Sequence, residues 1–228
     1  MIPWKLIDTA DVPGGGEPLR LMQRGKEFTI KLGQNELMSS RLYGSEEALA
    51  TLSCARLKAR PDPHLLIGGL GMGFTLRAAL KVLGPQARIT VAELVPAVIA
   101  WARGPMAELS GESLLDPRVD IREADVARLI AGGRGTYDAI LLDVDNGPQG
   151  LTRQSNDALY DSSGLRTAFA ALRPGGVLAG WSSHPDDRFA PRLRKAGFDT
   201  EEIKIRAPGR GGGGGARHVI WIATRPAR

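Results

Sequence analysis

His64–Arg77 reads HLLIGGLGMGFTLR, an apolar run that breaks into glycines and resumes with a pattern compatible with a helix. The glycines that end the run favour a strand feeding a turn over a buried helix. Glycine at Gly69, Gly71 and Gly73 lets a ligand approach the backbone closely and tolerates positive φ. The helix that follows would direct its free N–H groups at that ligand. The stretch therefore predicts a turn that binds a nucleotide or nucleoside.

The composition is that of a globular protein, because 228 residues with 43% apolar side chains can bury a sizeable core. No apolar run approaches the roughly 18 to 20 residues needed to span a bilayer. The first residues lack the layout of a secretory signal, so we expect a cytoplasmic protein with no membrane partner. The single cysteine, Cys54, excludes an internal disulfide and a thiolate metal cluster. The histidines His64, His184 and His218 show no metal-ligand spacing, and we predict no metal site.

The formal net charge of +5 is compatible with an acidic partner such as nucleic acid. Basic and acidic residues are nevertheless mixed along most of the chain, whereas a nucleic-acid footprint should be clustered. A mixed, solvated surface explains the charge better, so nucleic acid is not an expected partner. The last quarter of the chain is basic, which leaves a role in docking an anionic substrate open.

Residues 1–44 predict a small β-rich appendage, and residues 45–228 predict the main domain. Strands in the appendage are expected at 19–22, 28–32 and 36–39, separated by glycine-containing turns. From Ser45 the apolar pattern changes to a helical period, with acids in the first turn, and continues until Pro61.

Strands and helices then alternate, which predicts an α/β fold with a doubly wound, mostly parallel seven-stranded sheet of the Rossmann-like type. The strands are expected at 65–67, 88–92, 119–123, 139–142, 177–180, 199–206 and 218–223. The helices are expected at 74–83, 96–109, 126–131, 164–172 and 187–196. The last two strands predict an antiparallel final hairpin. The glycine-rich loop 209–215 between them is either a lid or disordered.

Acidic residues stand at the ends of three predicted parallel strands, where ligands of open α/β sheets bind. Glu93 closes the second strand about twenty residues beyond the glycines, where a carboxylate can accept hydrogen bonds from ribose hydroxyls. Asp125 follows the third strand, and Asp143 and Asp145 follow the fourth. A dinucleotide site is the main competitor, but its G-x-G-x-x-G fingerprint would require glycine at Phe74. The tighter glycine spacing suits a nucleoside without a pyrophosphate.

Taken together, these motifs resemble the class I fold of S-adenosylmethionine (AdoMet)-dependent transferases, the class I methyltransferase fold. Within it they are most similar to the spermidine synthase group of aminopropyltransferases. The resemblance covers roughly residues 40–225 and rests on LIGGLGMG (66–73), VAEL (91–94), DPRV (116–119), EAD (123–125), YDAILLD (137–143) and LRPGGVL (172–178).

The resemblance implies that the chain binds AdoMet or decarboxylated AdoMet. The implied cofactor-binding positions are Gly68, Gly69, Gly71, Met72, Gly73, Glu93, Leu94, Asp125, Val126 and Asp143. In the family, Glu93 would hold the ribose hydroxyls, and Asp125 would hold the adenine amino group. The implied catalytic positions are Asp143, Asp145 and Tyr43. A carboxylate at Asp143 would take or orient the proton of an amine nucleophile. A homodimer is implied as well.

Two departures from the aminopropyltransferase pattern concern the transferred group. Met72 stands where the resembling enzymes place an acid, and Asp145 comes one position earlier than their second acid. Because a pocket for a polycation should be rich in acids, these departures slightly favour methyl transfer to a small acceptor, for which an amine is one candidate. The alternatives are an aminopropyltransferase, a polyamine synthase that uses decarboxylated AdoMet, and a non-catalytic nucleoside-binding or interaction module.

Three residues keep a second interpretation. Tyr43 is either a lip of the site or packing between the appendage and the core. Asp145 is either the second acid of the acceptor site or a cap of the following loop. Trp181 either walls the acceptor pocket or covers the sheet edge.

Overall fold

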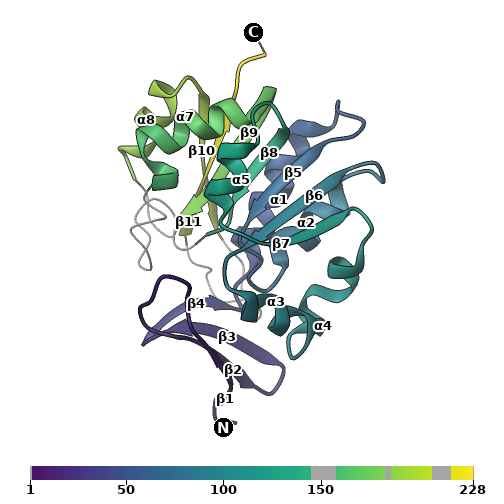
Figure 1. Cartoon of the computed structure of the whole chain (residues 1–228), viewed down its shortest axis with the longest axis vertical. Coiled ribbons are helices and arrows are strands. Elements are labelled where there is room, and N and C mark those ends of the chain that lie inside the picture. Colours follow the sequence, from purple (N-terminus) through teal and green to yellow (C-terminus); the bar gives the residue numbers. More distant parts are fainter. Residues whose placement is uncertain (1, 145–157, 183–185, 207–216, 228) are drawn as a thin grey trace.

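A computed structural model of the chain describes residues 2–144, 158–182, 186–206 and 217–227 (Figure 1). It contains two sheets, a four-stranded antiparallel sheet in the order β1-β2-β3-β4 and a seven-stranded sheet in the order β10-β11-β9-β8-β5-β6-β7. The small sheet lies across one end of the larger α/β unit. The predicted fold class, a mostly parallel seven-stranded sheet with a β-rich N-terminal appendage, is confirmed.

The N-terminal sheet has one strand more than the sequence predicted. Its strands are β1 (Lys5–Ala10), β2 (Leu19–Arg24), β3 (Glu27–Leu32) and β4 (Asn35–Ser39). The additional strand is β1, whose side chains are all exposed or half-buried. An edge strand of this kind carries no strict apolar alternation, which is why the periodicity did not reveal it.

The large sheet follows the predicted strands closely. They are β5 (His64–Gly68), β6 (Arg88–Glu93), β7 (Val119–Glu123), β8 (Tyr137–Leu142), β9 (Leu172–Ser182), β10 (Asp199–Arg206) and β11 (Arg217–Thr224). The first five are parallel to one another, and β11 is antiparallel to both of its neighbours, β9 and β10. The predicted antiparallel final hairpin is therefore confirmed, with its second strand inside the sheet and its first at the edge.

One predicted helix is divided in two. The α-helices are α1 (Gly44–Cys54), α2 (Phe74–Val82), α3 (Pro96–Arg103), α4 (Ala107–Ser110), α5 (Val126–Gly132), α7 (Ser162–Ala171) and α8 (Phe189–Lys195). Short 3-10 helices follow at Ala55–Leu57 and Gly111–Leu115. A single helix was expected over 96–109, but it ends at Arg103. Pro105 removes a backbone donor and disfavours helical geometry at Gly104, which explains the break.

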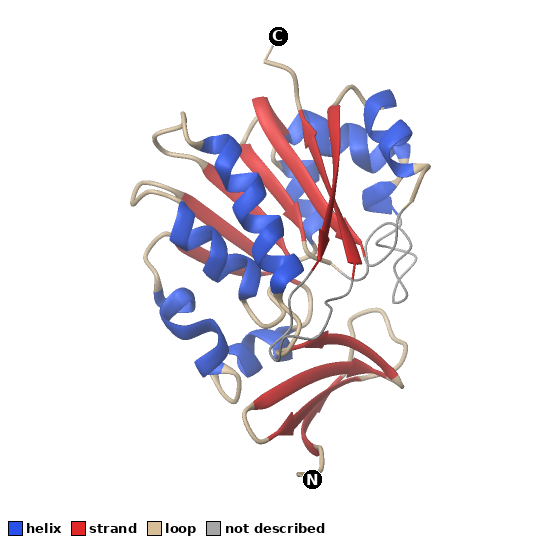
Figure 2. Ribbon diagram, turned by 180° about the vertical axis from the view of Figure 1, so that it is seen from behind, coloured by secondary structure: helices blue, strands red, loops and turns tan. Residues whose placement is uncertain are grey.

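Helices cover both faces of the large sheet (Figure 2). Alternate residues of β5 face opposite sides, so Leu65 and Ile67 pack in the core beneath α1 and α2. Leu66 packs in a second core with residues of α5, α7 and α8. Burial on both faces explains why the strands read as continuous apolar runs. In the described part of the chain, no helix is long and apolar enough to cross a membrane.

A third apolar cluster joins the N-terminal sheet to the α/β unit. Leu21 and Phe28 of the small sheet pack with Phe74 of α2 and Trp101 of α3. The indole Nε1 of Trp101 also donates a 2.7 Å hydrogen bond to Oδ2 of Asp8 on β1. This packing holds the small sheet over the carboxyl ends of the parallel strands.

The opposite end of the parallel strands is held by one buried carboxylate. Asp138, near the start of β8, is 1% exposed and accepts the backbone N–H of His64 at 2.8 Å. Its side chain also forms ion pairs with Arg173, at 2.8 Å, and with Arg60. These contacts join β5, β8 and β9 at the end of the sheet away from the small sheet.

Candidate functional site

A cavity lies between the carboxyl ends of the parallel strands and the N-terminal sheet. One wall comes from the small sheet and from the loop between its first two strands, and apart from Glu17 its side chains are apolar: Val12, Leu19, Ile30, Leu32, Leu37 and Met38. The other wall comes from the strand ends and the turns that follow them, with Gly69, Gly71, Ala92, Glu93, Leu94, Val95, Val98, Ala124, Asp125, Val126, Asp143, Val144 and Trp181. The cavity thus occupies the position that the sequence predicted for a ligand.

The glycine turn between β5 and α2 is shaped by positive φ angles, which are 88° at Gly69, 51° at Gly71 and 78° at Gly73. A Cβ atom at Gly69 would lie 2.3 Å from the carbonyl oxygen of Asp143. Only glycine therefore allows β5 and β8 to end in contact beneath the cavity.

The backbone N–H groups of this turn are paired inside the protein. Gly69 donates to the carbonyl of Ala92 at 2.8 Å, and Gly73 donates to that of Leu70 at 2.8 Å. The Met72 N–H faces the sulfur of Met38 at 3.2 Å. The Gly69 and Gly73 N–H groups are therefore used inside the protein, where they stabilise the turn.

Glu93 at the end of β6 holds the turn and lines the cavity. Its Oε2 accepts the Leu70 N–H at 2.9 Å, and its Oε1 accepts the Val95 N–H at 2.9 Å. Burial raises the pKa of Glu93, and hydrogen bonds from backbone N–H groups, including that of Gly71, oppose the rise. The carboxylate is therefore fixed in orientation at the position predicted for ribose recognition.

Asp125 is the N-cap residue that precedes α5, and it lines the cavity together with Val126 and Leu94. Its Oδ1 accepts the Ala127 N–H at 2.8 Å, which caps the helix. Val126 also explains Gly68, because a Cβ atom there would lie 2.9 Å from a methyl carbon of Val126.

Asp143 follows β8 and is held by two side chains. The Thr75 hydroxyl donates to its Oδ2 at 2.6 Å, and the indole Nε1 of Trp181 donates to its Oδ1 at 2.7 Å. Burial raises the pKa of Asp143, and these two hydrogen bonds oppose that rise. Asp143 and Trp181 both line the cavity, so a reacting group there would meet a buried carboxylate of fixed orientation.

Glu46 is a second buried acid near Asp143. It is 4% exposed, and its Oε2 accepts a 2.6 Å hydrogen bond from the hydroxyl of Ser45. Burial, followed by the negative charge of Asp143, raises the pKa of Glu46 to about 7. Within the described ranges, no ion pair joins Glu46 to a basic side chain. An ionised Asp143 therefore disfavours the ionisation of Glu46.

Several predicted site residues lie away from the cavity lining. Tyr43 stacks on Phe74, with ring centroids 4.8 Å apart, which agrees with the packing role that the sequence left open. Met72 is 1% exposed and belongs to the cluster beneath the small sheet. Gly73 begins α2. Asp145, His184 and the loop 209–215 lie outside the described residues.

Sequence reasoning missed several residues of the site. Glu17 follows a run of three glycines that reads only as a loop, yet it lines the cavity. Met38 stands in a predicted strand, where an apolar residue is the norm. Thr75 could have been predicted, because it places a hydroxyl in the first turn of the helix that follows the glycines.

Among the residues that the structure describes, no group of three or more His, Cys, Asp and Glu side chains is arranged to hold a metal ion.

No protein-family model matches the chain. Curated relatives do match it. Polyamine aminopropyltransferase 1 of Streptomyces coelicolor is 32% identical over 177 residues, which are 73% of this chain and 31% of that protein. The polyamine aminopropyltransferase of Mycobacterium tuberculosis is 28% identical over 173 residues, 72% of this chain and 32% of that protein.

This chain thus spans about a third of the length of the curated relatives it matches. Among solved structures, spermidine synthase from Thermotoga maritima superposes with a TM-score of 0.76 at 19% identity, covering 98% of this chain and 74% of that one. A spermidine synthase in complex with the transition state analogue AdoDATO gives a TM-score of 0.75 at 19% identity, with coverages of 98% and 73%.

Proposed function

We propose, from the premise that this chain has the spermidine synthase fold, that it transfers an aminopropyl group from decarboxylated AdoMet to a small amine. The observation that carries the proposal is the charge of the cavity. Glu17, Glu93, Asp125 and Asp143 line it, whereas no Lys, Arg or His does so among the described residues. A sulfonium donor and an amine acceptor are both cationic, so an anionic cavity with apolar walls suits both of them.

The same charge pattern favours the decarboxylated donor over AdoMet itself. AdoMet carries a carboxylate, and a carboxylate buried without a partner loses much of its hydration energy. The described lining provides no basic side chain, and the glycine turn uses its own N–H groups internally. The sequence slightly favoured methyl transfer because of Met72 and Asp145. The relatives and the charge of the cavity favour the aminopropyl alternative.

The nucleoside part of the donor is assigned to the strand ends. In this proposal, Glu93 accepts hydrogen bonds from the ribose hydroxyls, and Asp125 accepts one from the adenine amino group. Ala92, Val95 and Val126 supply apolar surface around these two acids. The reactive end of the donor and the amine acceptor would then meet at Asp143, across the glycine turn from Glu93 and Asp125.

When bound, the donor supplies an activated propyl carbon, whose bond to the sulfonium breaks as the amine nitrogen forms its bond to that carbon, releasing methylthioadenosine. Asp143 takes or orients the proton that the amine loses. Thr75 and Trp181 fix the carboxylate for this task. Most of the rate enhancement would come from aligning the two reactants.

Calorimetry followed by product analysis tests the proposal. We expect decarboxylated AdoMet to bind more tightly than AdoMet, and unbranched diamines to gain an aminopropyl group by mass spectrometry while methylthioadenosine is released. Tighter binding of AdoMet and a methylated product would support the methyltransferase alternative. Nucleoside binding without transfer to any acceptor would support the non-catalytic one.

A homodimer and a cytoplasmic location complete the proposal. Sedimentation tests the homodimer, and cell fractionation tests the location.

A further inference from the structure

The side chain of Met38 reaches from the N-terminal sheet into the glycine turn. It lines the cavity, and its sulfur lies 3.2 Å from the backbone nitrogen of Met72. A Cβ atom at Gly71 would lie 2.5 Å from the Met38 methyl carbon and 2.7 Å from the sulfur. The absence of a side chain at Gly71 therefore makes room for the Met38 thioether as well as for a ligand.

The strand pairing of the small sheet places both Leu37 and Met38 at the cavity. Ile30 pairs with Met38, whereas the next residue of β3, Lys31, pairs with Glu36, so Leu37 is an extra residue in β4. Successive residues of a regular strand point to opposite faces. Met38 faces the cavity because it pairs with Ile30, which also lines it, and the bulge lets the extra residue Leu37 line the cavity as well.

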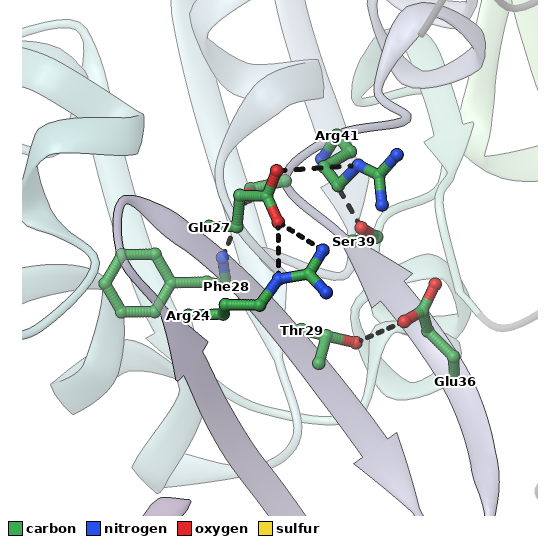
Figure 3. A network of polar contacts seen from close by, with 8 residues as sticks. Arg24, Glu27, Phe28, Thr29, Glu36, Ser39 and Arg41 are labelled. Carbon is green, nitrogen blue, oxygen red and sulfur yellow. Dashed lines mark hydrogen bonds and ion pairs between the residues drawn. The ribbon is translucent and has the colours of Figure 1, made fainter. Parts of the chain in front are cut away.

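Polar contacts around β3 and β4 hold the bulged strand in place (Figure 3). The Thr29 hydroxyl lies 2.8 Å from Oε2 of Glu36 and 2.9 Å from the carbonyl oxygen of Met38 itself. Glu27 of β3 pairs with Arg24 at 2.7 Å and with Arg41 at 3.6 Å. The backbone that carries Met38 is thus fixed on both sides of the bulge.

We propose that Met38 determines donor specificity by occupying the Met72 N–H and the space beside Gly71, which closes this end of the donor site to a tail that bears a carboxylate. A thioether is a weak acceptor, whereas a carboxylate is a strong one, so AdoMet would gain at this N–H only by displacing Met38. Decarboxylated AdoMet has no carboxylate to accept a hydrogen bond from the Met72 N–H, so its binding does not depend on displacing Met38. This inference rests on the proposed function and names the residue behind its donor preference.

The test compares the dissociation constants of AdoMet and methylthioadenosine, which share the nucleoside but differ in the tail. Met38→Ala should tighten AdoMet binding about tenfold relative to methylthioadenosine, because a charged acceptor gains a hydrogen bond. Met38→Leu keeps the bulk and should leave the ratio close to that of the unmodified chain. Met22→Ala, a half-buried methionine of β2 that does not line the cavity, is the matched control.

An unchanged ratio in Met38→Ala, or an equal shift in Met22→Ala, would overturn the inference while leaving the proposed function intact. If the unmodified chain binds neither methylthioadenosine nor decarboxylated AdoMet, the proposed function fails and the inference fails with it. Should Met38→Ala not fold, Met38→Thr shortens the same side chain with a residue that suits a strand. The same tenfold relative gain is expected for it.

Discussion

The indole Nε1 of Trp181 donates a 2.7 Å hydrogen bond to Oδ1 of Asp143, so a side chain at the end of β9 holds the acid at the end of β8. Thr75 at the start of α2 holds the other oxygen at 2.6 Å. Two side chains, from α2 and β9, thus fix one buried carboxylate from both sides. A second acid, Glu46, lies close enough that the negative charge of Asp143 adds to burial in raising the pKa of Glu46.

The hydrogen bond from Trp181 should influence the pH at which kcat/KM falls on the acidic side of the pH–rate profile. Trp181→Phe keeps a ring but removes the donor that lowers the pKa of Asp143. If Asp143 acts as a base, its pKa should rise and the acidic limb of kcat/KM should move to higher pH. Trp221→Phe, a buried tryptophan on the other face of the sheet, is the control. If the acidic limb does not move, the hydrogen bond from Trp181 does not control the ionisation of the catalytic base.

Asp143→Asn should impair turnover far more than binding. An amide cannot take the proton of the amine, so we expect turnover to fall by roughly a hundredfold or more. Binding of methylthioadenosine should change by no more than about threefold, since it depends on the nucleoside contacts. Circular dichroism checks that the variant is folded, because one of the two donors facing Asp143 loses its acceptor. Unchanged turnover would remove Asp143 from the mechanism.

Glu46 should make the folded state less stable as the pH rises. Its folded-state pKa is raised to about 7, so protonated Glu46 favours folding. That contribution is present below the ordinary glutamate pKa and is lost as the pH rises through about 7. Glu46→Gln should therefore gain stability over the unmodified chain between pH 5 and pH 8, by up to about 3 kcal/mol.

Urea unfolding at both pH values measures this difference in the free energy of unfolding. Glu47→Gln replaces an acid in the same helical turn, one that pairs with Arg77 at 3.0 Å, and serves as the control. A difference between Glu46→Gln and the unmodified chain that does not change with pH would contradict the raised pKa.

Asp138 should be a stability residue with little effect on ligand binding. Asp138→Asn weakens two ion pairs with Arg60 and Arg173 and leaves them near a neutral group, so we expect a loss of about 2 to 4 kcal/mol. Asp120→Asn breaks an exposed pair with Arg122 and should cost less than about 1 kcal/mol. Urea unfolding compares the two variants. Equal effects would show that burial of Asp138 does not matter.

The sequence revealed the large sheet well, because strands buried on both faces read as apolar runs between glycine and proline punctuation. The stretch around Gly69 also predicted the glycine turn that follows β5 and lines the cavity. The edge strand β1 carries no such pattern. Pro105 divides α3 from α4. The proline is visible in the sequence, but the apolar residues on either side of it led to the prediction of one continuous helix.

The site was predictable where it depends on position along one strand and not where it depends on contacts across the chain. Glu93, Asp125 and Asp143 stand at strand ends, and all three line the cavity. Nothing local in the sequence brings Glu46 toward Asp143 or Met38 onto the Met72 N–H. These contacts arise from the docking of the small sheet and of α1, which periodicity does not encode.

The location of the cavity between two sheets also bears on how the protein folds. The wall from the small sheet is encoded before residue 40, whereas Trp181 of the opposite wall follows more than half of the chain later. Contacts so distant in sequence carry a loop-closure cost that is recovered only after the large sheet has closed. A binding-competent cavity is therefore a late product of folding, and a tight ligand should slow unfolding by holding its two walls together.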